Sequence, residues 1–207
     1  MYTILGYKIY DSTYPQMKII DTPKFVLRPV QESDVYDLYE YLSQEKVVKH
    51  LPFSAHKNLD ETQKFIQSFF INNYKKGKVG NYAIYHKKDR KVIGNIGINN
   101  VSPKSNDCKI GICLNPKYWG NDYSTELTVL VLITGFELMN LNKLIAITYS
   151  ENKYSSKCLY NTGFKYIKTY KPQKSIPLSH RFELTKDEYF ELKKEFFPNL
   201  IKQFKNK

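Results

Sequence analysis

The sequence predicts a single α/β domain, and three observations support this fold class. Its 207 residues, of which 42% are hydrophobic and 25% are charged, suit one folded domain with a sizeable core. Short apolar segments typical of strands alternate with segments at helical spacing. Between residues 110 and 149, a strand, an apolar helix and a second strand follow one another, which predicts two parallel strands joined by a right-handed crossover.

The first half of the chain predicts a strand followed by two helices. The strand ends at Pro29, because proline cannot donate a hydrogen bond to a sheet ladder. The first helix follows an acidic turn that suits a helix N-terminus, and the second begins at Asn58 in a sequence close to a capping box. The predicted elements are a hairpin or arm within residues 1–20, a strand at 25–29, and helices at 33–43 and 59–74.

The second half predicts six strands, two helices and a helical tail. The longer helix is apolar almost all round, so we expect it to be buried. Gly163 suits the C-terminal cap of the shorter helix. The predicted strands are 81–85, 91–101, 110–114, 144–149, 165–170 and 181–184, and the helices are 125–139 and 155–161. We therefore expect an N-terminal extension at 1–22, one domain at 23–185 and a basic helical tail at 186–207.

Charge and cysteine content limit the classes of function. A net charge of +12 and a pI near 9.4 favour an anionic partner, but the basic residues are scattered and no nucleic-acid-binding module is recognisable. The cysteines and histidines show no spacing typical of metal ligands or of a disulfide framework. The longest purely apolar run, residues 129–133, is too short to span a membrane, and no export signal is evident. We expect a cytoplasmic protein with no metal and no membrane segment.

One turn suits the binding of an anion. Residues 117–126, Lys-Tyr-Trp-Gly-Asn-Asp-Tyr-Ser-Thr-Glu, lead into the predicted buried helix, whose first backbone N–H groups and positive dipole end attract negative charge. Every strand–helix–strand unit has such a turn, so the turn alone is a weak indication. The sequence has no GxGxxG motif and no Walker lysine, so it supports neither a dinucleotide-binding nor a P-loop site.

The turn is one of four segments that follow one another in a characteristic order. They are residues 25–34, residues 91–97 (Lys-Val-Ile-Gly-Asn-Ile-Gly), residues 110–126, and residues 150–164 with their closing Gly-Phe. In pattern and in order these segments resemble the GNAT N-acetyltransferases. Within that superfamily they are most similar to the branch of the ribosomal-protein acetyltransferases RimJ and RimL. The resemblance covers the chain from about Phe25 to Phe182.

This resemblance implies the GNAT fold, in which helices flank a mixed central sheet with two splayed parallel strands, here 110–114 and 144–149. It also implies acetyl-CoA as the cosubstrate. The pantetheine arm would pair with strand backbone, and the diphosphate would lie on backbone amides of the turn. The residues that the resemblance assigns to acetyl-CoA are Ile112, Leu114, Trp119, Gly120, Asn121, Asp122, Tyr123, Ser124, Thr125 and Asn152.

The implied reaction is acetyl transfer to a primary amine. The neutral amine attacks the thioester carbonyl, a backbone amide stabilises the oxyanion, and Ser155 occupies the position from which some relatives protonate the departing thiolate. The acceptor could be a protein N-terminus, an amino sugar or a small-molecule amine. The sequence does not specify it, because its site is expected from the variable helices 33–43 and 59–74 and the loop 171–180.

Several of these residues also have a structural interpretation. Asn152 and Ser155 each suit the N-cap of the short helix. Tyr160 is either a proton donor or an ordinary surface or core tyrosine. Trp119 suits a packing anchor better than a substrate platform.

Two positions depart from the family pattern. Asp122 stands where the phosphate turn normally has glycine, and its carboxylate would repel a diphosphate by roughly 4 kcal/mol at 4 Å, or by about 1 kcal/mol if it faces solvent. Lys109 stands where the branch often has a glutamate proposed as the general base, which leaves Asp107 or water for that role. A second hypothesis therefore stays open: a degenerate GNAT domain that binds a ligand, RNA or the ribosome without catalysis. A homodimer is a further open possibility.

Overall fold

The computed structural model describes residues 1–49, 51, 53–174 and 176–206. Its contacts divide the chain into two compact units. Unit 1 consists of Met1–Gly97 and Ile112–Asn121, and unit 2 consists of Ile98–Gly111 and Asp122–Lys207. The strands β6 (Lys91–Ser102) and β7 (Asp107–Leu114) contribute residues to both units. Ser175, in the predicted loop 171–180, and Lys207, in the predicted tail, lie outside the described residues.

Unit 1 contains an antiparallel sheet in the order β1-β2-β3-β4-β5-β6, with the end of β7 next to β6. Its other strands are β1 (Tyr2–Ile4), β2 (Tyr7–Asp11), β3 (Lys18–Asp21), β4 (Phe25–Pro29) and β5 (Tyr82–His86). A row of cross-strand partners, Ile9, Ile20, Leu27 and Ile84, is fully buried and forms part of the core. The predicted N-terminal hairpin and the strand at 25–29 are confirmed.

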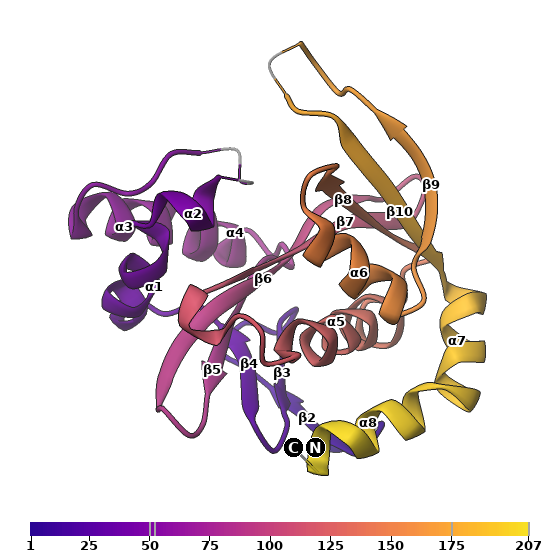
Figure 1. Cartoon of the computed structure of the whole chain (residues 1–207). Coiled ribbons are helices and arrows are strands. Elements are labelled where there is room, and N and C mark those ends of the chain that lie inside the picture. Colours follow the sequence, from indigo (N-terminus) through magenta and orange to yellow (C-terminus); the bar gives the residue numbers. More distant parts are fainter. Residues whose placement is uncertain (50, 52, 175, 207) are drawn as a thin grey trace. The chain divides into compact units, whose positions relative to one another are not determined.

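The helices of unit 1 are grouped together (Figure 1). They are the short 3₁₀ turn Glu32–Asp34, α1 (Val35–Leu42), α2 (Glu45–Val48), α3 (Leu59–Phe65), a π-helical stretch Ile66–Ile71, and α4 (Asn72–Lys75). The Asn58 side chain accepts a hydrogen bond of 2.9 Å from the backbone N–H of Glu61, so the predicted start of the second helix is confirmed. The predicted helix 59–74 is real but changes to π-helical winding midway, and α2 was not predicted.

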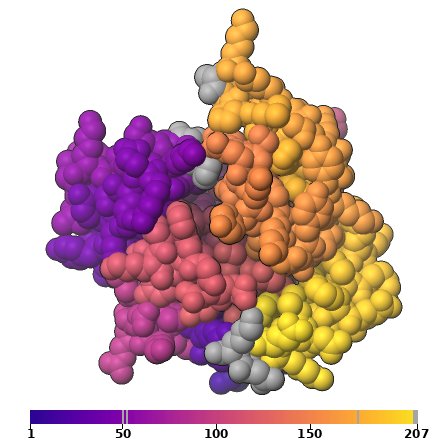
Figure 2. All heavy atoms as spheres, in the orientation of Figure 1, coloured from indigo at the N-terminus to yellow at the C-terminus, as the bar shows by residue number. Residues whose placement is uncertain are grey.

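Unit 2 has the strand order β6-β7-β8-β10-β9. Its remaining strands are β8 (Lys143–Tyr149), β9 (Lys165–Tyr170) and β10 (Ser179–Thr185). β7 and β8 run parallel, from Asp107 opposite Lys143 to Ile110 opposite Ala146, and the pairs β8–β10 and β10–β9 are antiparallel. The predicted parallel pair is confirmed, although β7 begins earlier than residue 110. The β9–β10 hairpin is long (Figure 1), and its tip projects from the surface of unit 2 (Figure 2).

The crossover between β7 and β8 is the helix α5 (Tyr123–Ile133), continued by a π-helical stretch Thr134–Leu138. Residues 126–136 are all buried, which confirms the predicted buried helix. A Cβ atom on Gly135 would lie only 2.7 Å from the Leu144 side chain on β8. The glycine therefore lets the π-helical stretch that continues α5 lie close against β8.

Three helices complete unit 2: α6 (Lys153–Asn161), α7 (Lys186–Glu195) and α8 (Phe197–Asn206). α6 begins two residues before the predicted start at 155. Gly163 has a φ of 90°, and a Cβ there would lie 2.3 Å from the Leu192 side chain on α7, so this position needs glycine on both counts. The helical tail is confirmed as α7 and α8. No helix of the described chain is long and apolar enough to cross a membrane.

Candidate active site

The segment between β7 and α5 is braced within unit 1 by its own hydrogen bonds. Asn115 accepts a bond of 3.1 Å from the backbone N–H of Lys117 and so caps a short 3₁₀ turn. The indole N–H of Trp119 donates to the Leu114 carbonyl at 2.9 Å. Trp119 is 51% exposed, so only about half of the side chain packs against the protein. Its indole closes the loop back onto the end of β7 through this hydrogen bond.

Gly94 explains how β7 approaches β6 so closely. A Cβ at this position would lie 2.2 Å from the Cys113 carbonyl oxygen, which a real side chain cannot do. The backbone N–H of Asn115 donates to the Ile93 carbonyl at 2.7 Å at the same point. The glycine within the Val-Ile-Gly pattern therefore positions the end of β7, where Ile112 and Leu114 are predicted to pair with pantetheine.

The turn itself contains two residues in the left-handed region, Gly120 with a φ of 82° and Asp122 with a φ of 58°. Asp122 is the N-cap residue of α5, but its carboxylate does not cap the helix. Aspartate is among the few residues other than glycine that tolerate this conformation. The Asp122 side chain is exposed, which places the carboxylate in solvent. The backbone N–H of Thr125 donates to the Asp122 carbonyl at 3.1 Å, so this amide is already engaged.

Two side-chain contacts hold the first turn of α5 in unit 2. The Thr128 hydroxyl donates to the Ser124 carbonyl at 2.7 Å and lies 3.3 Å from the Cys158 sulfur on α6. Burial raises the pKa of the Cys158 thiol, so it stays protonated. This contact joins α5 to α6 close to the residues predicted to bind acetyl-CoA.

Asn152 is the N-cap of α6, since its side-chain oxygen accepts a hydrogen bond of 3.1 Å from the backbone N–H of Ser155. The capping interpretation of Asn152 is therefore confirmed, and that of Ser155 is wrong. Ser155 lies in the first turn of the helix, and its hydroxyl has no hydrogen-bond partner in the part of the chain that the structure describes. A free hydroxyl at that position is available to a ligand.

Lys109 is exposed on β7, opposite Ile145 in the register with β8. It forms no ion pair with any residue that the structure describes, so no neighbouring carboxylate pairs with its charge there. Asp107 lies two residues earlier on the same strand. The general base therefore stays unassigned. No group of three or more His, Cys, Asp or Glu side chains among the described residues is arranged to hold a metal ion.

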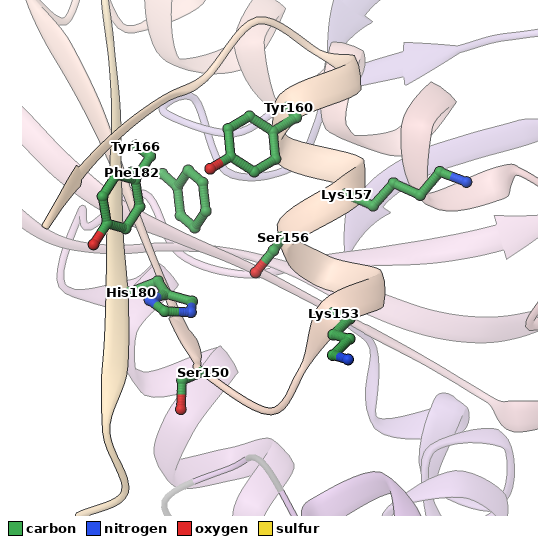
Figure 3. A pocket seen from close by; sticks show the side chains of 8 residues that line it. All are labelled: Ser150, Lys153, Ser156, Lys157, Tyr160, Tyr166, His180 and Phe182. Atoms are coloured by element: carbon green, nitrogen blue, oxygen red, sulfur yellow. The ribbon is translucent and has the colours of Figure 1, made fainter. Parts of the chain in front are cut away.

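Unit 2 also has a cavity of about 470 Å³ along α6, which the sequence did not predict. Its walls come from α6 and from the strands β9 and β10 (Figure 3). Lys153 and Ser156 lie beside Asn152 and Ser155 in the sequence, but they line this cavity. The opposite wall contains Tyr166 and His180, which only the pairing of β9 with β10 brings to the same place.

The parallel β7–β8 pair, the buried crossover helix α5 and the left-handed turn before it define the GNAT class of acetyltransferase fold. A family model described as "Acetyltransferase (GNAT) domain" matches residues 24–165, more than half of the chain. The chain therefore belongs to this family, whose members take the acetyl group from acetyl-CoA. The fold class and cosubstrate implied by the sequence resemblance are confirmed.

Individual relatives agree with this family. The uncharacterised N-acetyltransferase p20 of Bacillus licheniformis is 26% identical over 178 residues, which cover 84% of this chain and 99% of that protein. A structure of spermidine N-acetyltransferase from Vibrio cholerae with CoA and spermine has a TM-score of 0.70 at 14% identity, covering 82% of this chain and 99% of that one. RimL, the ribosomal L7/L12 α-N-protein acetyltransferase, in complex with CoA, has a TM-score of 0.68 at 16% identity, covering 81% and 97%.

Proposed function

We propose that the protein transfers the acetyl group of acetyl-CoA to a primary amine, and that the turn of residues 119–125 holds the CoA diphosphate. The observation that carries this assignment is the left-handed pair Gly120 and Asp122 directly before the buried helix α5. An α-helix leaves its first N–H groups without intrahelical partners, and such groups bind phosphate well. Tyr123 and Ser124 supply these groups here, together with the amides of Gly120 and Asn121.

The sequence resemblance gives contacts with the pantetheine arm to Ile112 and Leu114 of unit 1 and, separately, to Asn152 of unit 2, and each is considered within its own unit. Ile112 and Leu114 offer strand backbone that the Gly94 contact holds in place, which suits strand-like pairing with an extended arm. The Asn152 oxygen is used as the cap of α6, so its contribution to CoA is through the amide NH₂ group. The two roles are compatible because they use different atoms of the same side chain.

Ser155 is proposed as the proton donor to the leaving thiolate. The amine nitrogen bonds to the acetyl carbonyl carbon, the carbon–sulfur bond breaks, and the CoA sulfur takes a proton from the Ser155 hydroxyl. The proton released by the amine passes to water or to a base that is not assigned, and solvent returns a proton to the Ser155 oxygen. The free hydroxyl of Ser155 in the first turn of α6 supports this role.

The proposal also includes the branch of the family, the location in the cell, the domain limits and the partners. Similarity in sequence pattern and in fold to RimL supports the RimJ/RimL branch. Cytoplasmic residence, the domain limits 23–185, and a homodimer or a ribosome contact are further proposals that the sequence motivates.

The function is tested by two measurements on the full chain. Calorimetry with acetyl-CoA tests the cosubstrate site, and release of CoA in the presence of a panel of amines tests the reaction. We expect acetyl-CoA to bind and at least one amine to accelerate CoA release. No binding at millimolar acetyl-CoA would contradict the site. Binding without turnover on any amine would instead favour the degenerate, ligand-binding domain.

A further inference from the structure

The cavity along α6 is lined by four aromatic rings in mutual contact. Tyr160 meets Phe182 edge-to-face with ring centroids 5.2 Å apart, and Tyr166 meets Phe182 and His180 at 5.8 and 5.7 Å. Phe182 is only 1% exposed and forms the floor, whereas Tyr160 and Tyr166 are 56% and 44% exposed. The two tyrosines therefore present ring surface that a flat ligand can cover.

A chain of hydrogen bonds fixes the strand side of the cavity. The hydroxyl groups of Tyr166 and Thr169 are 2.7 Å apart, and the Thr169 hydroxyl lies 2.7 Å from Nδ1 of His180. With Nδ1 engaged, Nε2 is the ring nitrogen left for a ligand. When Tyr166 donates to Thr169 and Thr169 donates to Nδ1, Nε2 carries the hydrogen and donates. An anion bound in the cavity favours this tautomer, because Nε2 then donates a hydrogen bond to it.

All the charged side chains that line the cavity are lysines. Lys153 and Lys157 lie one helical turn apart on α6, and none of the lining residues is acidic. Neither lysine forms an ion pair with a residue inside the described ranges. In Figure 3 the Ser156 hydroxyl, the Tyr160 hydroxyl and the His180 ring point into the space, whereas the Lys157 side chain extends away from the rings. Lys153 is therefore the better placed cation.

We propose that this cavity binds a small organic anion with an aromatic ring. The ring covers the exposed faces of Tyr160 and Tyr166, beside the Phe182 ring that contacts both, and the anionic group meets the Lys153 ammonium and Nε2 of His180. A volume of about 470 Å³ falls within the range of small-molecule sites. The lining has two lysines and no carboxylate, so its charge favours an anion over a polyamine.

The same ligand chemistry can come from the amine acceptor or from a separate effector. Ser156 lines the cavity, whereas Ser155 precedes it on α6 and points about 100° around the helix axis, so its place in the chain favours neither source. The acceptor alternative rests on the proposed acetyl transfer, whereas binding of the anion does not. Two probes separate the sources: 3-phenylpropionate has the ring and the carboxylate, and phenylalanine adds an amine to them.

Binding of both probes to the full chain is measured by calorimetry without acetyl-CoA. We expect both to bind, and we expect Lys153→Gln and Tyr160→Ala each to weaken binding about two- to tenfold. Lys202→Gln is the control for the loss of one positive charge, because Lys202 lies on α8 and does not line the cavity. Tyr154→Ala is the control for the ring, since Tyr154 is on the same helix, 90% exposed and outside the cavity lining. Circular dichroism of every variant checks that it is folded.

CoA release with phenylalanine assigns the cavity to the acceptor, and binding without release assigns it to an effector; both support the proposal. No binding of either probe to the wild type would overturn it, as would equal weakening in the control variants. Loss of acetyl-CoA affinity in Tyr160→Ala, with no probe binding, would assign the cavity to the cosubstrate and also overturn it. Failure of the wild type to bind acetyl-CoA, with the probes still bound, would contradict only the proposed acetyl transfer.

Discussion

The Glu40 carboxylate on α1 lies 2.8 Å from the ammonium of Lys117, in the segment that leads from β7 to α5. Lys91 on β6 is a second ionic partner of the same carboxylate. Hydrogen bonds from Lys117 and then Lys91 lower the pKa of Glu40 to about 2. α1 is one of the helices expected to shape the acceptor site. This ion pair therefore ties that helix, within unit 1, to the segment that precedes the turn proposed to bind acetyl-CoA.

The first prediction concerns the effect of pH on this contact. A carboxyl group whose pKa is lowered by folding contributes stability above its unfolded value, here about 4.5, and this stability is lost as the pH falls toward 2. We expect Glu40→Gln to lower the free energy of unfolding by about 1 kcal/mol at pH 7, because solvent screens the exposed Lys117. Urea unfolding of the two proteins should show the difference narrowing progressively below pH 4.5.

Glu45→Gln on the neighbouring helix is the control for this prediction. Glu45 is exposed, and the structure gives it no ion pair among the described residues. This variant should lose less stability than Glu40→Gln at pH 7, because Glu45 interacts only with the N-terminus of a four-residue helix. If the deficit of Glu40→Gln were as large at pH 3 as at pH 7, the ion pairs would not be its cause.

The second prediction concerns the charge of Asp122. Its φ of 58° is open to glycine and asparagine as well, so Asp122→Gly and Asp122→Asn both remove the charge without forcing the turn. Because the carboxylate is exposed, its repulsion of the diphosphate is about 1 kcal/mol or less. We expect both variants to bind acetyl-CoA more tightly, by up to about fivefold, in calorimetry at low salt. Unchanged affinity in both would show that the carboxylate points away from the diphosphate.

The third prediction concerns the backbone at Gly120. A Cβ there would meet no atom within 4 Å, so only the φ of 82° requires glycine. We expect Gly120→Ala to cost about 1–2 kcal/mol, and to weaken acetyl-CoA binding if the turn relaxes to avoid this strain. Gly120→Asn should recover part of the loss, because asparagine tolerates positive φ.

Gly111→Ala is the matched control for the third prediction. Gly111 also has open space around its Cβ position, but its φ is not positive. It should therefore bind acetyl-CoA as the wild type does and unfold at a similar urea concentration. An equal loss in Gly111→Ala and Gly120→Ala would contradict the role given to the left-handed turn.

The order of the elements could be predicted from the sequence because its signals are local. The apolar periodicity of α5, the capping sequence at Asn58 and the proline at the end of β4 each act within a few residues. α2 was not predicted, because a helix of four residues is too short to show a recognisable apolar periodicity. The start of α6 was placed late, because Asn152 and Ser155 are both good capping residues and only the hydrogen bond from the Ser155 amide decides between them.

The parts of the site that the sequence did not predict depend on contacts between distant segments. His180 meets Tyr166 only through the register of β9 with β10, in which a bulge shifts the pairing next to Phe182. The ion pair of Glu40 with Lys117 likewise joins α1 to a segment that is separated from it in the sequence by the three strands β5, β6 and β7. No local pattern encodes such pairs, since they follow from the packing of the whole unit.

The last prediction separates the structural role of Asn152 from the proposed catalytic role of Ser155. Asn152→Ala removes the cap of α6 and should lower the free energy of unfolding by about 1 kcal/mol, whereas Asn152→Asp should keep it. Ser155→Ala leaves the backbone N–H that the cap uses, so we expect stability and acetyl-CoA affinity to be retained. With the best amine of the panel, its kcat should fall about 10²-fold through loss of the proton donor. An undiminished kcat would show that water protonates the thiolate instead.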